Sequence, residues 1–573
     1  MKIVKLFLLI IIIASANFAL SQVELAPPSH PVYDFLKRMQ IAEIIDYNSS
    51  QIPISRGEIA KFLVTIRNRT DGSMLTGSIE ANKNPLTSVD KKILADFLEE
   101  FKYDMGTPVS ENISSFGDDF DSKKIFSQTH QKYLYKYLDS NVSFFVDGLA
   151  SFSTRHSNGD TLGKNTLNLT DIGLRFRGTL YNSVGFYLRA SNGRKMTGDS
   201  SAIVFGKATD PRLAASRKFP TEGYFDSFEG YLRYQTQTNW FSLMVGRESF
   251  YQGFGYADKL FFSNNTVPFD GVNLKLQYKA LRYSFFYGGL KGDSLGKDVI
   301  NKTIATHRLD VNFSPKFRMG FWEALVTATS AFSFSNMNPI SFLISVDYND
   351  YVGSNPNNNL FGIDMEVQPW KNTAFQATLL VDELSLSALF KPGEHIPADT
   401  KFGWQLGSIW NNAFTIPNLT GILEFTHIDP FVYTHRSYKS AFTNWSMPLG
   451  HKLSPNSDEI ALKIAYNLTH RVKLDFGYQF QRSAGGIVYD SQGNIIINYG
   501  GDINNGAGDG PDNQTSFLDG FRVNRNIFTA GLRIEPLKQL YFDFKYVYNN
   551  INNIYESKKY DNNYFFATLR FDY

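Results

Sequence analysis

The acidic and imidazole side chains that could do chemistry gather in one stretch of the second half of the sequence. Glu424, His427, Asp429 and His435 lie close together, and carboxylate–imidazole sets serve as general acids and bases or as metal ligands. Their spacing matches no metal-binding motif, and the sequence has no nucleophile-elbow, zinc-protease or phosphate-loop signature. A hydrolase on this cluster is therefore a minor alternative, and we expect no catalytic residue, metal or cofactor.

Two further observations narrow the chemistry. The chain of 573 residues contains no cysteine, which excludes a structural disulfide, a thiolate metal site and a cysteine nucleophile. Residues 502–513 are rich in Asp, Asn and Gly, but they lack the glutamate and the spacing of a calcium-binding loop. We interpret them as a flexible polar loop, with loop calcium as the less favoured alternative.

Aromatic and amide residues occur together in two other stretches, a combination that suits sugars. Ring faces contact the apolar side of a sugar, and amides hydrogen-bond its hydroxyl groups. The alternative is ordinary loop composition and an aromatic girdle at a membrane interface. The residues are Tyr348, Tyr351, Asn355, Asn357, Asn358 and Asn359 in the first stretch, and Tyr433, Tyr438, Asn444 and Trp445 in the second.

In the segments that must position these residues, apolar and polar residues alternate with a period of two. From Val472 to Phe480 every even position is apolar and every odd one is polar or glycine, and residues 460–466 and 542–548 repeat the pattern. Aromatic residues make up 15% of the chain, yet the mean hydropathy is −0.25. This balance is typical of strands with one face toward lipid and one toward water. The net charge of +2 gives no indication of a nucleic-acid partner.

The lengths of strands and connections favour a transmembrane barrel over a soluble sandwich. Alternating runs last about 9–11 residues, as a tilted span requires, and aromatic residues cluster near their ends. Short connections such as 181–183 and 468–470 alternate with long ones such as 191–226 and 482–521, as in barrels with short periplasmic turns and long outer loops. The alternating, aromatic carboxy-terminus, ending at Tyr573, resembles the signal read by the outer-membrane barrel assembly machinery.

We therefore predict a mainly β protein, an antiparallel β-barrel of about 18 strands in the outer membrane over residues 127–573, with both chain ends in the periplasm. The other long connections are 327–359 and 428–457. The strands are expected at 142–153, 167–180, 184–191, 227–235, 240–250, 270–278, 282–290, 304–313, 318–326, 360–368, 374–383, 401–410, 419–427, 458–467, 471–481, 526–535, 539–549 and 563–573.

Strand parity also predicts which polar side chains line the lumen. Both charge signs are present, so a mutually paired wall is the simpler interpretation, and a polar path or a polysaccharide-contact surface is the functional one. The predicted lumen-lining residues are Arg175, Arg177, Arg189, Arg233, Asp364, Asp382, Glu424, Lys473, Asp475, Lys545 and Arg570, with Lys275, Arg308, Asp310, Glu366, Arg533, Asp543 and Asp572 in the same register.

The first part of the chain follows a different pattern. Residues 1–21 have the positive start, apolar stretch and small-residue cleavage site of a signal peptide. Within 22–126 apolar residues recur with helical spacing in three runs, the second opening on the capping box Ser55 to Glu58. We expect a small periplasmic helical module, followed by a polar linker over 106–126. Its helix, turn and S-R-x-E order resembles an S-layer-homology module, so peptidoglycan binding is an alternative.

Several motifs across the barrel resemble the capsule assembly protein Wzi family. Residues 245–248 (VGRE) precede QGFGY at 252–256, LFFSNN at 260–265 and PF at 268–269. Further matches are NP at 338–339, LLVDE at 379–383, EFT at 424–426, DPFVYTH at 429–435 and PLGH at 448–451. Gln252 stands where the family more often has Trp.

The resemblance implies a non-catalytic outer-membrane barrel that binds or anchors capsular or extracellular polysaccharide, with outer membrane lipid as its surroundings. Loops are then expected to fold over the outer mouth. The alternative is a porin-type or carbohydrate-selective channel. Under the polysaccharide hypothesis the expected contact residues are Arg247, Tyr256, Asn264, Asn265, Tyr433 and His435, with stacking or interfacial anchoring as the two possible roles of the tyrosines.

Overall fold

The chain forms a closed antiparallel β-barrel in a computed structural model that describes residues 22–70, 86–105, 111–114, 126–295, 298–328, 333–350, 357–382, 401–435, 438–506 and 515–573. Eighteen long strands of this described part make up the wall, and the last strand, β26, pairs with the first, β4. The prediction of an eighteen-stranded barrel is confirmed. Residues 1–21, the expected signal peptide, lie outside the described residues.

Each of the eighteen strands lies where the alternating pattern predicts one, and many extend further than predicted toward the end with long connections. Neighbouring strands pair in sequence order around the ring. The strands are β4 Val142–Gly159, β5 Asn165–Leu180, β6 Val184–Thr197, β7 Tyr224–Gln235, β8 Phe241–Glu248, β10 Phe269–Tyr278, β11 Leu281–Leu295, β12 Asp298–Ser314, β13 Phe317–Thr327, β14 Asn358–Trp370, β15 Thr373–Asp382, β16 Lys401–Asn411, β17 Leu419–Ile428, β20 Ser457–Thr469, β21 Val472–Ser483, β24 Val523–Leu537, β25 Leu540–Asn553 and β26 Lys558–Asp572.

The outward face of the wall is apolar. Ile172, Leu232 and Leu406 point away from the lumen and are 70%, 63% and 53% exposed. Such a belt of exposed aliphatic and aromatic side chains is what a transmembrane barrel presents to lipid. Among the described residues no helix is both long and apolar enough to cross a membrane.

Three helices form near the start of the chain at the places that the helical spacing predicts. They are α2 Val32–Ile41, α3 Arg56–Thr70 and α4 Ser88–Glu100. The backbone N–H of Glu58 donates to the Ser55 hydroxyl at the start of α3, and Thr87 caps α4 by accepting from the Asp90 N–H. These bonds satisfy donors that a helix start otherwise leaves free.

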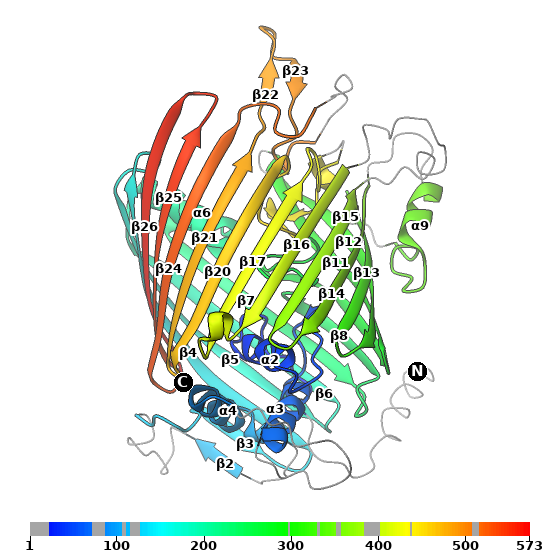
Figure 1. Ribbon diagram of the computed structural model, residues 1–573, viewed down its shortest axis with the longest axis vertical. Coiled ribbons are helices and arrows are strands. Elements are labelled where there is room, and N and C mark those ends of the chain that lie inside the picture. Colours follow the sequence, from blue (N-terminus) through cyan, green and yellow to red (C-terminus); the bar gives the residue numbers. More distant parts are fainter. Residues whose placement is uncertain are drawn as a thin grey trace.

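We expected these helices to form a small periplasmic module joined to the barrel by a linker; in the structure they fill one end of the barrel. In Figure 1, α2 lies within the barrel and α3 and α4 lie at its opening, at the end where strands are joined by short turns. Wall residues bond directly to this segment, for instance Arg177 to Glu24 at 2.9 Å and Asn312 to Asn48 at 2.7 Å. The polar lumen wall supplies the partners that the polar groups of the segment need when they leave water.

The expected linker over 106–126 also takes part in the fold. Its residues Glu111–Ser114 form β2, which pairs with β3, Tyr135–Leu138. Strand β3 in turn pairs with the first residues of β4, beyond the point where β26 ends. The boundary between the predicted module and the barrel is therefore bridged by strand pairing.

The opposite end, where the connections are long, is closed by segments that fold inward. Between β6 and β7 the helices α6 Ser200–Thr209, α7 Pro211–Ala215 and α8 Phe219–Glu222 pack on inward-facing rings, with Phe205 stacked 5.4 Å from Tyr564. The connections 249–268 and 429–456 meet one another, where Tyr433 donates to the Leu260 carbonyl. Arg217 beside α8 lies over the Trp445 ring, so the inward segments contact each other across the mouth.

Described residues of the connection 482–521 also pack on these inward segments, since the Phe431 N–H donates to the Gly500 carbonyl and Ile503 belongs to the same apolar cluster as Phe261. In the connection 327–359, the described residues 333–350, which include α9 Leu343–Asp350, lie against the outside of the wall (Figure 1). There the Leu343 N–H donates to Glu323, which bonds His307 at 2.8 Å. The connection 482–521 also contains the hairpin of β22 Ile487–Tyr489 and β23 Ile495–Asn498, which projects from the top of the barrel in Figure 1.

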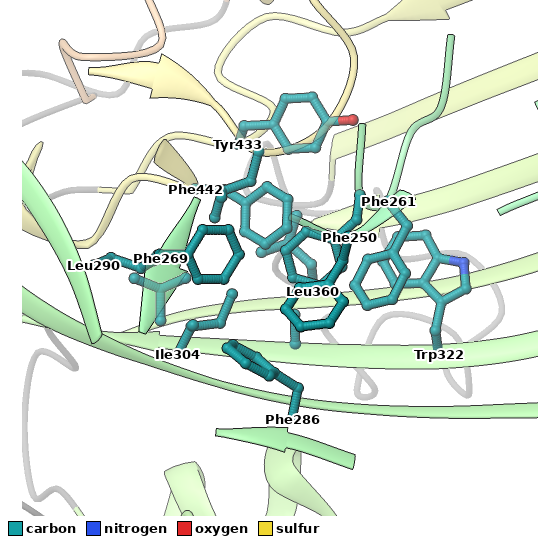
Figure 2. Packing of buried hydrophobic residues seen from close by; sticks show 14 of the residues in the cluster. Phe250, Phe261, Phe269, Phe286, Leu290, Ile304, Trp322, Leu360, Tyr433 and Phe442 are labelled. Carbon is teal, nitrogen blue, oxygen red and sulfur yellow. The ribbon is translucent and has the colours of Figure 1, made fainter. Parts of the chain in front are cut away.

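An apolar core fills the lumen on one side. Figure 2 shows rings from 249–268 and 429–456 packed on inward residues of β10–β14, with Phe261 stacked 4.3 Å from Trp322. Tyr433 and Phe442 add a second stacked pair at 5.6 Å. Aromatic pairs of this kind contribute about 0.5–1.5 kcal/mol each beyond the area they bury, so this side of the barrel is a solid body rather than a pore.

Candidate functional site

The other side of the lumen is hollow. A cavity of about 880 Å³ lies between the amino-terminal segment and the inward faces of β4–β6, β20, β21 and β24–β26. Its lining includes thirteen lysines and arginines but only seven aspartates and glutamates. Several of these cations pair with carboxylates that lie just outside the lining, such as Arg175 with Asp147 and Arg533 with Asp543. We refer to this space as the basic cavity.

Most of the predicted lumen-lining residues pair with a partner inside the barrel. Arg175 bonds Asp147 at 2.7 Å, and Lys473 bonds Asp34 at 3.3 Å and Asp475 at 3.4 Å. These pairs correspond to the simpler interpretation of a mutually neutralised wall. The other pairs are Arg177 with Glu24, Arg189 with Glu229, Arg233 with the Val23 carbonyl, Asp364 with Arg308, Asp382 with the Tyr433 N–H, and Arg570 with Asp572 at 4.0 Å.

Glu424 has a structural role. Its carboxylate accepts the N–H groups of Tyr256, Ala257 and Asp258 and the side-chain amides of two glutamines. It therefore fixes the inward connection 249–268 to β17. A carboxylate that already accepts this many hydrogen bonds has no lone pair left for a ligand.

Lys545 differs from the other predicted lumen residues. Within the described part of the chain no carboxylate lies within ion-pair distance of it, and its electrostatic neighbours are Lys452 and Lys463. Lys463 donates to the Ala257 carbonyl at 2.6 Å, and Lys452 is 4.0 Å from Glu459. Lys463 also has Asp258, Glu424 and Glu459 as charged neighbours, so carboxylates compensate Lys452 and Lys463 but not Lys545. We call Lys452, Lys463 and Lys545 the lysine cluster.

The wall next to the lysine cluster carries glycines that keep the space open. Gly531 is the cross-strand partner of both Lys545 and Asp475. A Cβ at Gly531 would meet nothing closer than 3.4 Å, and one at Gly477 nothing closer than 3.6 Å. Neither glycine is needed for backbone conformation or close packing, so both leave room in front of the wall.

At the end with short turns the cavity is bounded by a charged group of the amino-terminal segment. His30 Nε2 lies 2.8 Å from Glu100, and Lys538 lies 3.8 Å from the same carboxylate. Burial by itself would raise the pKa of Glu100, but the surrounding cationic groups, led by His30, hold that pKa well below its usual range. Glu100 is therefore ionised and ties α4 to the turn between β24 and β25.

Two of the predicted polysaccharide contacts reach the basic cavity. Asn264 and Asn265 line it from the connection 249–268. Asn265 donates to the Gly450 carbonyl at 2.8 Å, whereas the exposed Asn264 side chain has no hydrogen-bond partner among the described residues. Asn264 is thus the predicted contact that is most available to a ligand.

Of the two predicted tyrosine contacts, Tyr433 is buried and Tyr256 is partly buried. Tyr433 is 0% exposed and donates to the Leu260 carbonyl. Tyr256 donates to Glu366 inside the filled side of the lumen. The Tyr433 ring is enclosed by protein and offers no surface for a sugar, so neither stacking nor interfacial anchoring describes this residue. Both tyrosines hold inward connections in place.

Arg247 and His435 also lie away from the basic cavity. Arg247 points outward from β8, where it pairs with Asp270 and lies over the Phe228 ring. The ion pair is partly exposed on the outer face of the wall rather than in a loop above it. His435 is buried within the connection 429–456.

The acid–imidazole cluster is divided by the wall. Glu424 points inward, whereas His427 points outward, stacks on Trp404 and bonds Asp429 at 2.9 Å. Alternate residues of a strand face opposite sides of a sheet, so these groups do not converge. Over the described ranges no set of His, Asp and Glu side chains is placed to hold a metal ion. Part of the loop 502–513 lies outside the described residues, and Asp502 accepts hydrogen bonds from Asn504 and Asn505 within it.

The charged side chains of the S-layer-like motif form ion pairs within the protein. Arg56 bonds Asp104 and lies 4.1 Å above the Phe101 ring, and Glu58 is 4.0 Å from Arg282. Burial raises the pKa of Asp104 to about 6, although Arg56 opposes the shift. The charged groups of the motif thus connect α3 to its surroundings.

Sequence reasoning missed Lys452 and partly missed Lys463. The alternating run 460–466 already assigns Lys463 to the inward face, and only its pairing remained undetermined. Lys452 lies in a long connection, where no periodicity indicates a direction. Its approach to β20 is set by the tertiary path of the connection.

Comparison with known proteins agrees with this architecture. The sequence matches the family described as capsule assembly protein Wzi over residues 164–494. No curated protein matches it. A solved structure described as Wzi, an outer-membrane protein involved in group 1 capsule assembly in Escherichia coli and a carbohydrate-binding β-barrel, superposes with a TM-score of 0.56 at 13% identity, covering 95% of this chain and 98% of that one.

Two solved barrels are more distant. OprD of Pseudomonas aeruginosa gives a TM-score of 0.42 at 9% identity, covering 75% of this chain and 95% of that one. OccAB1 of Acinetobacter baumannii gives 0.45 at 9% identity, covering 75% and 96%. The family match spans more than half of the sequence and includes the connections 191–226, 249–268 and 429–456. The chain belongs to the capsule assembly protein Wzi family.

Proposed function

We propose that this chain is an outer-membrane barrel that binds capsular or extracellular polysaccharide and holds it at the cell surface without catalysis. Membership of the Wzi family supports this function, and the E. coli structure that it resembles is described as a carbohydrate-binding barrel involved in capsule assembly. The expected partners are outer-membrane lipid, the polysaccharide and, during biogenesis, the barrel assembly machinery.

The observation that carries the proposal is the plug inside the lumen. A porin needs a continuous aqueous path, but here α2 and the connections 249–268 and 429–456 occupy the interior and bond to the wall on several strands. A barrel of this strand number is wide enough for a channel unless it is plugged. The plug therefore favours a binding role over transport.

The proposed orientation follows from the connections. Short turns lie at one end together with α2–α4, and long connections lie at the other. In outer-membrane barrels short turns face the periplasm. We therefore assign α2–α4 to the periplasmic end and the connections 191–226, 429–456 and 482–521 to the cell surface, where they are accessible to polysaccharide.

The experiment is a clean deletion of the gene in its own host, with the full-length protein restored as the control. We expect the deletion strain to release surface polysaccharide into the medium, and the restored strain to retain it. Unchanged surface polysaccharide and unchanged release would contradict the proposal. Purified protein in planar bilayers supplies a second readout, because stable large currents would support the channel alternative and a silent barrel the binding role.

A further inference from the structure

We propose that residues 333–350, which include α9, form an interfacial membrane anchor whose apolar side chains enter the acyl-chain region of the bilayer. The segment belongs to the connection 327–359 and lies on the outer face of the wall rather than in the lumen (Figure 1). We call residues 333–350 the outer strap. Membrane anchoring by the outer strap does not depend on what the barrel binds.

The outer strap packs against the wall at a level within the strands rather than at their ends. Its residue Leu343 belongs to one apolar cluster with Ala305 of β12 and Leu325 of β13. Ala305 is near the middle of β12, and Leu309, on the same outward face of that strand, is 37% exposed. The outer strap is therefore continuous with the apolar belt that the barrel presents to lipid.

The outer strap also covers a polar pair on the outward face of the wall. His307 Nδ1 lies 2.8 Å from Glu323, and these two residues are 8% and 6% exposed. The Leu343 N–H donates to the same carboxylate at 3.2 Å, and the Tyr283 hydroxyl donates to the Pro339 carbonyl. Polar groups that leave water are costly unless they are hydrogen-bonded. These bonds satisfy the pair and hold the outer strap at its level on the wall.

The backbone of the outer strap is hydrogen-bonded without help from water. The Met337 N–H donates to the Ser333 carbonyl, and the Ile340 N–H donates to the Asn338 side chain. Most other N–H groups from Ser333 to Val346 also have an acceptor in the outer strap or on the wall. An irregular segment in water needs no such partners, whereas a bilayer supplies none to the backbone. The outer strap therefore meets the requirement that contact with lipid imposes.

The side chains that the outer strap exposes are large and apolar. Ile340 is 90% exposed, Phe334 83% and Phe342 57%. Interfacial anchors bury such side chains at the boundary between lipid headgroups and acyl chains. A second copy of the chain is the alternative cover for these residues, but continuity with the lipid-facing belt favours acyl chains.

Labelling at single positions tests the environment of the outer strap. The chain has no cysteine, so Ile340→Cys provides one site for a fluorescent label. Leu406→Cys on the apolar belt is the reference for lipid, and Ile496→Cys on the projecting hairpin β22–β23 is the reference for water. Each labelled protein is placed in nanodiscs of dioleoylphosphatidylcholine. We expect the label at position 340 to be quenched more by doxyl-labelled phosphatidylcholine, and less by aqueous iodide, than the label at position 496.

A charge at the same positions supplies an independent readout. Ile340→Arg should lower the folding equilibrium constant in dioleoylphosphatidylcholine vesicles by about tenfold or more, because an arginine that faces lipid is costly. Ile496→Arg should change the same constant by less than about threefold. Urea titrations measure both constants. Because Ile340 is 90% exposed, its replacement removes little packing within the protein.

Three results would overturn the anchor. A label at position 340 that iodide quenches as strongly as the label at position 496, or a cost of Ile340→Arg no larger than that of Ile496→Arg, would place the outer strap in water. Protection of position 340 from both quenchers would show that protein, such as a second copy, covers it. Heat-modifiable migration on gels shows that each variant is folded.

Discussion

The two sides of the lumen are built on strands with the same alternating pattern, but one side is packed with protein and the other is open. On the side of β10–β17, inward charges are sealed, and the side chains of Arg308 and Arg318 are 1% and 0% exposed. On the side of β20–β26, Arg533 and Arg570 are each 40% exposed. Strand parity therefore decides only whether a side chain points toward lipid or toward the lumen. The segments folded into the barrel decide whether it becomes core or cavity lining.

The largest expected difference between the two sides concerns charge pairs. Arg308→Ala would leave Asp310 and Asp364 buried without their partner, which costs about 3–5 kcal/mol. Arg533→Ala removes a pair with Asp543 that water already screens, and should cost less than about 1 kcal/mol. Urea unfolding of both variants in detergent measures the difference, and equal losses would contradict the division of the lumen.

Glycine substitutions test the same division by volume. A Cβ at Gly362 would overlap the indole ring of Trp322, whereas one at Gly477 would lie 3.6 Å from its nearest neighbour. Gly362→Ala should therefore destabilise the barrel by about 1–3 kcal/mol, and Gly477→Ala by less than about 0.5 kcal/mol. Thermal unfolding followed by gel migration compares them. A tolerated Gly362→Ala would show that the filled side is looser than its contacts indicate.

Two of the predicted contact residues, Tyr433 and Asn264, should differ in whether their substitution lowers stability or polysaccharide affinity. Tyr433→Phe loses a buried hydrogen bond to Leu260 and should lower stability by about 0.5–1.5 kcal/mol without changing polysaccharide affinity. Asn264→Ala should do the reverse, since its exposed amide bonds no described residue. Unfolding and titration on the same preparations check both effects. Loss of affinity in folded Tyr433→Phe would restore the tyrosine as a contact.

The smallest effect is expected on the outer face. Arg247 and Asp270 form a partly exposed pair with side chains 37% and 63% accessible, and such pairs contribute about 0–1 kcal/mol. Arg247→Gln should leave stability and polysaccharide retention near wild type. Release of polysaccharide by this variant would place a binding surface on the outside of β8.

The sequence alone determined the wall. Alternation over runs such as 472–480 assigns each side chain to lipid or lumen because the period of a strand is fixed by backbone geometry. Strand number and the order of short and long connections follow from the same local pattern. The helices α2–α4 were equally readable, since Ser55, Glu58 and the apolar spacing are local signals.

Only the tertiary structure decided what the inward residues do. Nothing local distinguishes Arg308, sealed beside Asp364, from Lys545, which has lysines for neighbours, because both are single inward charges on alternating strands. Likewise Tyr433 has the composition of a sugar-binding loop but is enclosed by connections far away in the sequence. Long-range packing of the amino-terminal segment and of the inward connections selects which half of the lumen is filled. The burial and ion pairing of inward side chains depend on that packing, which cannot be predicted from the residue pattern of a single strand.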